Sequence, residues 1–332
     1  MKMTKQAGLI RKALIATAAM AALAGFSPAR AQQPLTDVIY LLPAPATLPA
    51  FGPWMVAQQR GYFTQEGLKV TFQVARGGVD VAKMVGAGNA TIGGAIGDTP
   101  IMVRSNGIPV KAVAVLGGRS LMQLVINKDK GINSLKDLKG KTITALAFQD
   151  TTYFALLGML STVGLTKNDV NAQAAGPAGI YKLFLAGQAD AMASVPDWTY
   201  IVKTQGKMKI DIIPSDTVFK SMAQAIVASD ELIAKNPELI RKIVRATLKG
   251  MKDIMDNPAG AAADYVKINP QAKADEIAEI FKMFNEYVYQ GQAVLGEMDE
   301  ARLSNLQDFY LSQGIIEKKT PVNELYTNQF VK

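Results

Sequence analysis

An internal repeat constrains the fold of this sequence more than any other feature. Residues 87–99 and residues 186–198 each carry Ala-Gly-(Asn or Gln)-Ala, a short apolar run and then an aspartate, at an offset of 99 positions. The match extends upstream at the same offset, where Gly77 corresponds to Gly176. Each copy predicts a loop, a helix, a glycine-containing turn, a strand and a final loop. Because a solenoid needs at least about three copies at a period of roughly 20–50 residues, two copies predict two similar α/β lobes.

The end of each copy is a candidate site. Asp98 and Thr99 close the first copy, and Asp197 and Trp198 close the second. In open α/β sheets, ligands bind beyond the carboxyl ends of the strands, so these residues are expected to face a cleft between the lobes. The alternative for each aspartate is structural, since Asp is a common cap of the following helix. Both interpretations stay open at this point.

The first 31 residues have the three-part pattern of a secretory signal peptide. Basic residues precede an apolar run at 13–26, and Ala29-Arg30-Ala31 supplies a cleavage site, so the mature chain is predicted to begin at Gln32. The apolar run is shorter than the roughly 20 residues needed to span a membrane. These features predict a soluble periplasmic protein whose signal peptide is cleaved after Ala31.

The basic balance of the sequence comes largely from this leader. The whole chain has 36 basic and 28 acidic residues, but five of the basic residues lie in the leader, so the net charge falls from +8 to +3 in the mature chain. Nucleic-acid binding requires clustered Lys and Arg. No such cluster is evident in the mature sequence, and we expect no nucleic-acid partner.

The chain contains no cysteine and no histidine. It therefore has no disulfides, no Ser-His-Asp or Cys-His catalytic system, and no thiolate or imidazole zinc site. We expect no catalytic residues, no metal site and no cofactor. About 300 mature residues exceed the size at which a single core stops growing, which again predicts two domains.

Loops at predicted strand ends supply further candidates. A proline-rich loop at 43–49 follows the first strand, and Arg76-Gly77-Gly78 opens a helix whose free N–H groups suit a polar ligand. Residues 149–153 open another helix, in which Asp150 either acts only as the cap or joins the neighbouring hydroxyls in holding a ligand head group. The C-terminal part is predicted to be helical and to cover the first lobe, with helices at 237–256, 258–267, 274–286 and 299–313.

Four segments behind the leader resemble a known family when taken in order. They are Gly61-Tyr62-Phe63 with Glu66-Gly67-Leu68, then 97–100, 132–141 and 186–191. From Asp37 to Lys332 the sequence resembles the SsuA/THI5-like substrate-binding proteins of ABC importers for alkanesulfonates, taurine, nitrate and thiamine precursors.

The resemblance implies a type II periplasmic binding protein fold, in which two α/β lobes are joined by a two-strand hinge and the ligand cleft lies between them. It implies crossover strands at 121–127 and 223–228. The expected division is a signal peptide at 1–31, lobe I at 32–121 plus 228–332, and lobe II at 122–227 including the crossover strands.

The family's ligand loops fall on the strand-end loops already derived from the repeat. Arg119, just before the first crossover, is the cation expected to bind a sulfonate or carboxylate, and its structural alternative is a salt bridge to the opposite lobe. The candidate substrate-binding residues are Ala46, Phe51, Gly77, Gly78, Asp98, Thr99, Arg119, Gln149, Asp150, Thr151, Thr152, Tyr153, Pro177, Asp197 and Trp198.

The expected function is that of a monomeric, non-enzymatic receptor. It captures a small organic molecule, of sulfonate, carboxylate or pyrimidine-like chemistry, and delivers it to an ABC-transporter permease in the inner membrane. One alternative is a ligand-sensing input that acts in trans on a signalling receptor. The other is an enzyme like the fungal proteins that make the thiamine pyrimidine from a His side chain, which this chain lacks.

Overall fold

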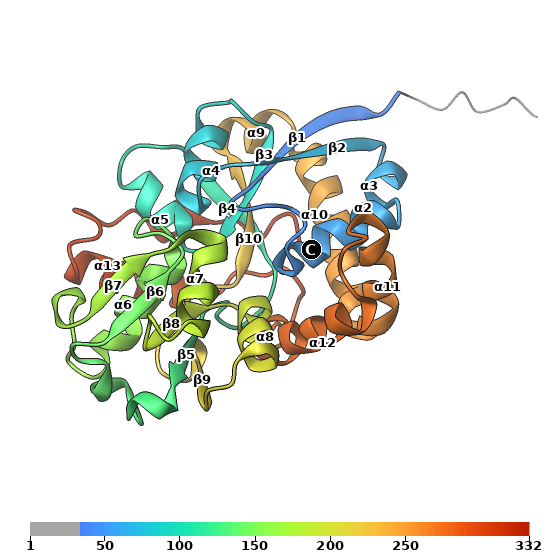
Figure 1. The fold of residues 1–332 in the computed structure, drawn as a ribbon. Coiled ribbons are helices and arrows are strands. Elements are labelled where there is room, and N and C mark those ends of the chain that lie inside the picture. The colour runs from blue at the N-terminus through green and yellow to red at the C-terminus, as the bar shows by residue number, and fades with distance from the viewer. Residues whose placement is uncertain (1–33, 332) are drawn as a thin grey trace, which may run out of the picture. The chain divides into compact units, whose positions relative to one another are not determined.

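Two five-stranded sheets form the framework of the protein (Figure 1). The structure is a computed structural model that describes residues 34–331, and the predicted signal peptide at 1–31 lies outside the described residues. From Thr36 onward the chain forms one compact unit. Among residues 34–331, no helix combines the length and the apolar character that crossing a membrane requires.

The two sheets have the same arrangement of strands. In each, one outer strand and the two strands next to it are parallel, and the fourth strand runs antiparallel to its neighbours. The sheet of lobe I has the order β2 (Leu68–Val74), β1 (Thr36–Leu42), β3 (Ile92–Ile96), β10 (Gln224–Ser229), β4 (Val110–Val115). The sheet of lobe II has the order β7 (Asn171–Ala174), β6 (Thr142–Ala145), β8 (Ala191–Ser194), β5 (Gln123–Asn127), β9 (Ile210–Pro214).

The sequence repeat corresponds to the centre of each sheet. Its copies fold as α4 (Gly78–Gly86) with β3, and as α7 (Gly176–Leu185) with β8. Both strands are buried along their whole length, as expected of strands that are covered on both faces. In β3, a Cβ atom on Gly93 would lie 2.3 Å from Cγ1 of Val81 in α4. Glycine there lets the helix approach the sheet, and the predicted α/β fold of two lobes is confirmed.

The remaining helices cover the sheets and begin at recognisable signals. Asn236 caps α10, where its side chain accepts a hydrogen bond from the N–H of Leu239 and Pro237 follows in the first turn. The longer helices are α2 (Gly52–Gln59), α6 (Thr151–Ser161), α8 (Pro196–Gln205), α10 (Pro237–Asp256), α11 (Pro258–Ile268), α12 (Ala274–Phe284) and α13 (Glu300–Ser312). Shorter helical segments are η1 (Pro49–Phe51), α3 (Tyr62–Gln65), α5 (Thr99–Arg104), η2 (Lys128–Lys130), η3 (Leu135–Leu138), η4 (Lys167–Asp169), η5 (Ser215–Thr217), α9 (Asp230–Lys235), η6 (Asn285–Tyr289) and α14 (Val322–Leu325).

Two segments carry the chain between the lobes, at 116–122 and 215–223. They lie side by side, because the N–H of Leu121 donates to the carbonyl of Met222 at 3.1 Å. Beyond the second segment, β10 pairs with β3 and β4 and so belongs to the sheet of lobe I. The expected boundary at 227 placed most of this strand in lobe II. The difference arises because the chain is already back in lobe I when β10 begins, and the strand pairs there with β3 and β4.

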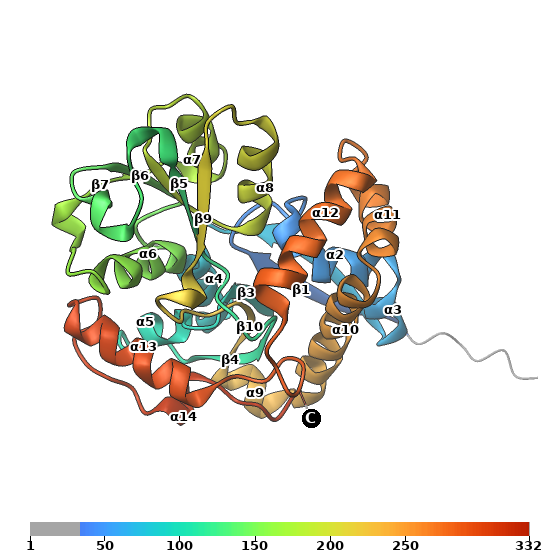
Figure 2. The ribbon, with the colours of Figure 1, turned by 90° about the horizontal axis from the view of Figure 1, so that it is seen from below.

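The C-terminal helices do not cover lobe I alone. Figure 2 shows α10, α11 and α12 beside α2 and α3, with α12 reaching α8 of lobe II, and α13 running along the other side. In α13, Phe309 packs edge-on against Phe219 at 4.8 Å, and Tyr310 packs against Phe154 of lobe II at 5.8 Å. The prediction that these helices cover the first lobe is therefore incomplete, since α13 contacts both lobes.

Candidate ligand-binding site

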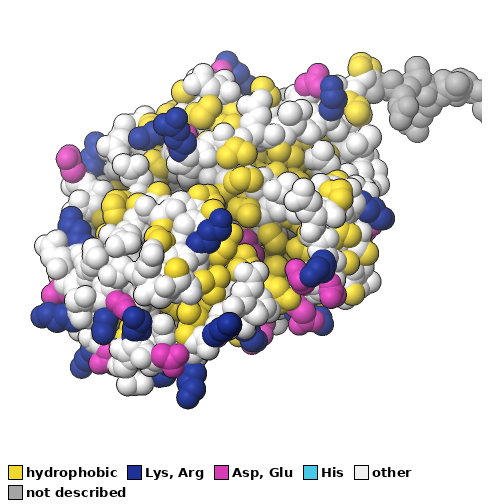
Figure 3. Space-filling view, in the orientation of Figure 1, with side chains coloured by type: hydrophobic (Ala, Val, Ile, Leu, Met, Phe, Trp, Pro, Cys, Tyr) yellow, Lys and Arg dark blue, Asp and Glu magenta, His cyan; other side chains and the backbone are white. Residues whose placement is uncertain are grey.

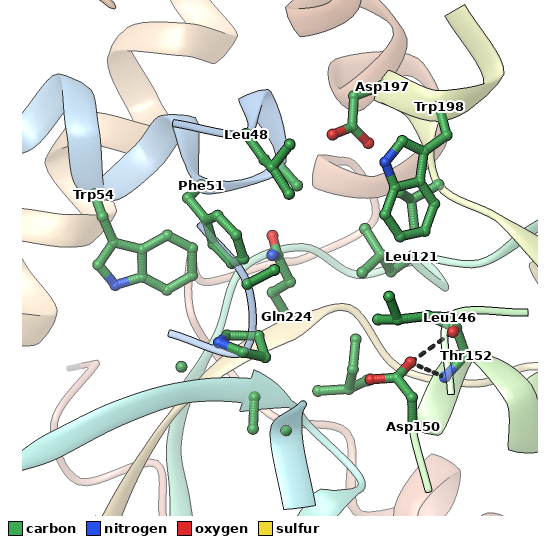
Figure 4. Close-up of a pocket in the computed structure, with 18 residues that line it drawn as sticks. Leu48, Phe51, Trp54, Leu121, Leu146, Asp150, Thr152, Asp197, Trp198 and Gln224 are labelled. Atoms are coloured by element: carbon green, nitrogen blue, oxygen red, sulfur yellow. Dashed lines mark hydrogen bonds between the residues drawn. The ribbon is translucent and has the colours of Figure 1, made fainter. Parts of the chain in front are cut away.

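A cavity lies between the two lobes, at the carboxyl ends of their central strands (Figure 4). Its volume is about 60 Å³, which is room for only a few water molecules, and the wider empty space of about 580 Å³ includes open solvent at its mouth. The lobes therefore lie close together. The lining residues are Pro43, Ala44, Leu48, Ala50, Phe51, Trp54, Gly78, Gly94, Ala95, Ile96, Leu121, Leu146, Asp150, Thr152, Val195, Asp197, Trp198 and Gln224.

Lobe I supplies an apolar and aromatic wall. The rings of Phe51 and Trp54 meet edge-on at 6.0 Å, one helical turn apart. The preceding proline-rich loop is held from behind, because the hydroxyl of Tyr265 and the side-chain amide of Asn269 both donate to the carbonyl of Thr47. A proline-stiffened loop of this kind loses little entropy on ordering, so the aromatic wall is preorganised.

Asp150 of lobe II is both a helix cap and a cavity residue. Its Oδ1 accepts hydrogen bonds from the N–H of Thr152 at 2.9 Å and from the Thr152 hydroxyl at 2.5 Å. The second carboxylate oxygen points away from Thr152 toward the cavity (Figure 4). Burial raises the pKa of Asp150, and the hydrogen bonds from Thr152 oppose that rise. Asp150 therefore caps α6 and also lines the cavity, and its contact with a ligand stays a prediction.

Asp197 lies in the first turn of α8 with its carboxylate turned toward the cavity (Figure 4). The side chain is buried, and neither carboxylate oxygen has a hydrogen-bond partner among the described residues. Burial raises its pKa to about 6. The nearby backbone N–H groups of Asp197, Trp198 and Ala50 lower it less, and none of the three reaches hydrogen-bond geometry with the carboxylate. The helix begins after Val195 without a side-chain cap, so capping does not explain this aspartate.

Trp198 separates the cavity from a second hollow. Its indole covers the cavity beside Asp197 (Figure 4). Leu48, Asp197 and Trp198 also line the second hollow, which Pro177, Tyr181 and Ile280 close from the other side. On the face drawn in Figure 3, hydrophobic side chains gather along the middle of the molecule, and Lys and Arg side chains lie mostly around them. Asp197 is the ionisable residue that the second hollow shares with the cavity, and the other residues lining that hollow are uncharged.

A cluster of buried polar groups lies behind the cavity. Asp98 is fully buried and its Oδ2 accepts a hydrogen bond from the hydroxyl of Tyr310 at 2.5 Å, while its Oδ1 has no partner among the described residues. The pKa of Asp98 rises to about 7, mainly through burial and further through the nearby charge of Asp150, against the bond from Tyr310. Thr99 and Thr151 also bury a hydroxyl that has no partner within residues 34–331.

The structure brings together six of the predicted site residues and separates the others. Phe51, Gly78, Asp150, Thr152, Asp197 and Trp198 line the cavity. Gly77 lies just behind it, since a Cβ atom there would be 3.9 Å from Oδ2 of Asp150. Pro177 lines the second hollow, and Tyr153 lines a separate groove with Phe148 and Phe154. Ala46, Asp98, Thr99, Gln149 and Thr151 are not among the residues that line the cavity.

Arg119 lies outside the cavity. Its Nη1 donates to the carbonyl oxygen of Glu286 at 2.8 Å, and the residue lines a hollow with Asp216 and Tyr287. The cause is η6, which packs against the preceding crossover and offers its carbonyls to the arginine, as the N–H of Arg119 also bonds to Val288. Among residues 34–331, no acidic side chain forms the salt bridge that was considered from the sequence, and Arg119 is not part of the cavity lining.

Twelve of the eighteen lining residues were not among the candidates from the sequence, and four of them show why. Trp54 lies one helical turn after Phe51, and this spacing indicates that the two side chains share one face of the helix. Gln224 is the polar residue that begins the otherwise apolar strand β10, and it also could have been found. Leu121 and Leu146 gave no such signal, because their place in the cavity depends on how the lobes meet.

The cavity is apolar with acidic groups as its only charges. The ionisable lining residues are Asp150 and Asp197, and no Lys or Arg belongs to the lining set. Across residues 34–331, no three acidic side chains converge as the ligands of a metal ion would. The arrangement is suited to enclosing a flat molecule and accepting hydrogen bonds from it.

Two sheets of this topology around an interlobe cavity define the periplasmic binding protein fold. A family model described as NMT1/THI5 like matches residues 48–261, and the chain belongs to this family. The alkanesulfonate-binding protein SsuA from Xanthomonas axonopodis pv. citri, bound to MOPS, superposes with a TM-score of 0.69 at 16% identity, over 90% of this chain and 99% of that chain.

Two curated relatives align over most of the chain. The riboflavin-binding protein RibY of Chloroflexus aurantiacus is 26% identical over 313 residues, which cover 92% of this chain and 89% of that protein. The 4-amino-5-hydroxymethyl-2-methylpyrimidine phosphate synthase of Aspergillus parasiticus is 24% identical over 310 residues, covering 89% and 88%. The chain is thus similar both to a protein named as a binding protein and to one named as a synthase.

Proposed function

We propose that this protein is a solute receptor of the periplasm, which encloses a small flat organic molecule between its lobes and presents it to an ABC importer in the inner membrane. The observation that carries the proposal is the cavity between the lobes, whose walls come from both sheets. A ligand that contacts both lobes stabilises the closed state over the open one, and this difference is what a membrane partner can recognise.

The proposed location in the periplasm depends on the predicted signal peptide. A signal peptide at 1–31 would place the mature chain, from Gln32, on the periplasmic side of the inner membrane. The lobes would move about the two crossover segments that run side by side at Leu121 and Met222. Because the cavity has room for only a few water molecules, the lobes would have to move apart to admit a ring-sized ligand.

The binding relative supports a flat ligand. RibY is named as a riboflavin-binding protein and covers nearly all of this chain. Riboflavin carries a planar ring system, and the walls formed by Phe51, Trp54 and Trp198 suit a planar body. Riboflavin is therefore the first probe to test, with substituted pyrimidines as the second.

The synthase relatives point to a second candidate, which the composition disfavours. The fungal enzymes that the sequence resembles build their pyrimidine from a His side chain of the protein, and this chain contains no His at all. It also contains no Cys, so neither of the usual nucleophile and base pairs is present. Binding without turnover is the function that fits these residues.

Tryptophan fluorescence gives a direct test. The chain has two tryptophans, Trp54 and Trp198, and both line the cavity. Titration of the mature protein with riboflavin, substituted pyrimidines, aromatic carboxylates and sulfonates should quench or shift this emission for at least one class, with saturation. Mass spectrometry of the recovered compound should show it unchanged. Absence of any saturable response across these classes contradicts the proposal, and recovery of a chemically altered compound favours the enzyme.

A further inference from the structure

We propose that the cavity selects a flat ligand that is neutral or cationic and donates N–H hydrogen bonds to Asp197 and Asp150, and that it rejects sulfonates and carboxylates. This inference rests on the proposed function, because it names the chemical class of the solute held at that site. It separates the protein from a neighbour of the same fold whose structure contains the sulfonate MOPS.

The charges of the lining carry the first step. Asp150 and Asp197 are its ionisable side chains, and the candidate cation Arg119 bonds instead to the carbonyl of Glu286. A third carboxyl, Asp98, lies close enough behind the cavity for the charge of Asp150 to raise its pKa. An anion placed here would face buried carboxyl groups with no lining cation to compensate it, in surroundings where unpaired charges are costly.

The unpartnered oxygens carry the second step. Both carboxylate oxygens of Asp197 are buried without a hydrogen-bond partner among the described residues. Buried polar atoms in native proteins are nearly always paired, so this side chain is arranged to accept donors from a molecule that the structure does not hold. Asp150 uses only Oδ1 for the cap on Thr152 and leaves its second oxygen for the cavity.

The placement of the two acids carries the third step. Figure 4 shows Asp197 and Asp150 on different sides of the cavity, with Leu121 and Leu146 between them and Phe51 to one side. A flat ring lying on these apolar side chains would present its edges to the carboxylates, while the amide of Gln224 approaches from lobe I. Exocyclic amino groups or protonated ring nitrogens on opposite edges match this arrangement.

The experiment compares ligands that share one ring and differ in charge. Benzamidine is a flat cation with N–H donors, benzamide is neutral, and benzoate and benzenesulfonate are anions. Thermal shift and calorimetry on the mature protein should rank benzamidine first, benzamide second and both anions at least tenfold weaker than benzamidine. In D197N the affinity for benzamidine should fall at least tenfold, and in D150N by a smaller factor.

The variants are chosen so that a loss of affinity can be distinguished from a loss of folding. Asn is isosteric with Asp and remains a good helix cap, so D150N keeps the start of α6. D256N alters an exposed aspartate at the end of α10, where it pairs with Lys252, and should leave the affinity unchanged. Circular dichroism of each variant verifies the fold.

The outcomes distinguish this inference from the proposed function. If benzoate or benzenesulfonate binds as tightly as benzamidine, or if D197N and D150N both keep the affinity of the preferred ligand, the inference is overturned while the receptor function stands. If the wider panel identifies a ligand that carries an anion into the cavity, the inference is likewise overturned. If no compound of either set binds, the proposed function fails, and the inference fails with it.

Discussion

Tyr310 in α13 donates a hydrogen bond of 2.5 Å to the carboxylate of Asp98, although the two residues are 212 positions apart. Both side chains are fully buried. Asp98 precedes α5 of lobe I, Asp150 of lobe II lies nearby, and α13 comes from the end of the chain. The C-terminal helix therefore fixes an acidic group at the point where the two lobes meet.

The stability of the protein should depend on the ionisation of Asp98. Burial raises the pKa of this carboxyl from its ordinary value to about 7, so the folded state retains a proton that the unfolded state has already lost. Stability is therefore greatest at low pH and falls as the pH rises from about 4 to 7, by up to about 1.4 kcal/mol per unit of pKa shift. Asp98→Asn removes this dependence. In urea unfolding, the free energy of unfolding of the variant relative to that of the wild type should be higher at pH 8 than at pH 5.

A second variant tests whether the ionisation of Asp98 causes this pH dependence of stability. Tyr310 and Asp150 are the titratable groups that face Asp98. Tyr310→Phe removes the one side-chain donor to the carboxyl and should cost about 1–3 kcal/mol, more at pH 8 than at pH 5, since an ionised carboxylate loses more. An equal cost at both pH values would mean that Asp98 does not titrate in this range.

Arg119 should be dispensable for binding. Its guanidinium bonds to the carbonyl of Glu286 and lines a hollow apart from the cavity. Arg119→Ala should leave the dissociation constant of the tightest ligand of the fluorescence panel within about twofold, and lower stability by roughly 0.5–1.5 kcal/mol through the lost hydrogen bond. A tenfold loss of affinity in calorimetry, with the fold intact, would restore the anion-binding role expected from the sequence.

Arg302 of α13 should support the hinge. It donates to the carbonyl of Ser221 at 2.9 Å and pairs with Asp216 at 3.0 Å, and that aspartate also accepts from the N–H and hydroxyl of Ser120. Arg302→Ala breaks a largely buried pair that touches both crossover segments, and should lower the free energy of unfolding by about 2 kcal/mol. Lys319→Ala is the matched control, because its exposed pair with Asp308 should contribute less than about 0.5 kcal/mol to urea unfolding.

Much of the fold was predictable because its signals are local. The repeat indicated two α/β units, and the Asn-Pro signals at Pro237 and Pro258 mark the starts of α10 and α11. The edge strand β7 was not expected from the sequence, since its four residues Asn-Ala-Gln-Ala are small or polar, are partly exposed and include no β-branched or aromatic residue. A return of the chain to lobe I at 223–228 was suggested by the sequence, but the expected boundary at 227 differs from the pairing of β10, because strand pairing depends on contacts distant in sequence.

The sequence could predict only those site residues whose position follows from the ends of strands. Asp150, Asp197 and Trp198 follow from their loops and line the cavity. The direction of Arg119 depends on η6, which lies more than 160 residues later and offers the carbonyl of Glu286. Tertiary packing determines which side chains point into the cavity. The position of a residue at the end of a strand gives no information about that packing.

Trp198 should contribute directly to affinity, because its ring is the wall shared by the cavity and the second hollow. Trp198→Ala removes a large buried aromatic surface and should weaken binding of the tightest panel ligand by about 1–3 kcal/mol in calorimetry. Trp198→Phe keeps a flat apolar wall and should recover most of that loss. Tyr326→Ala serves as the control, since this aromatic pairs with Glu300 away from the cavity and its loss should not change the affinity. Unchanged affinity in Trp198→Ala would mean that the ligand is held elsewhere and that the indole only fills the gap between the closed lobes.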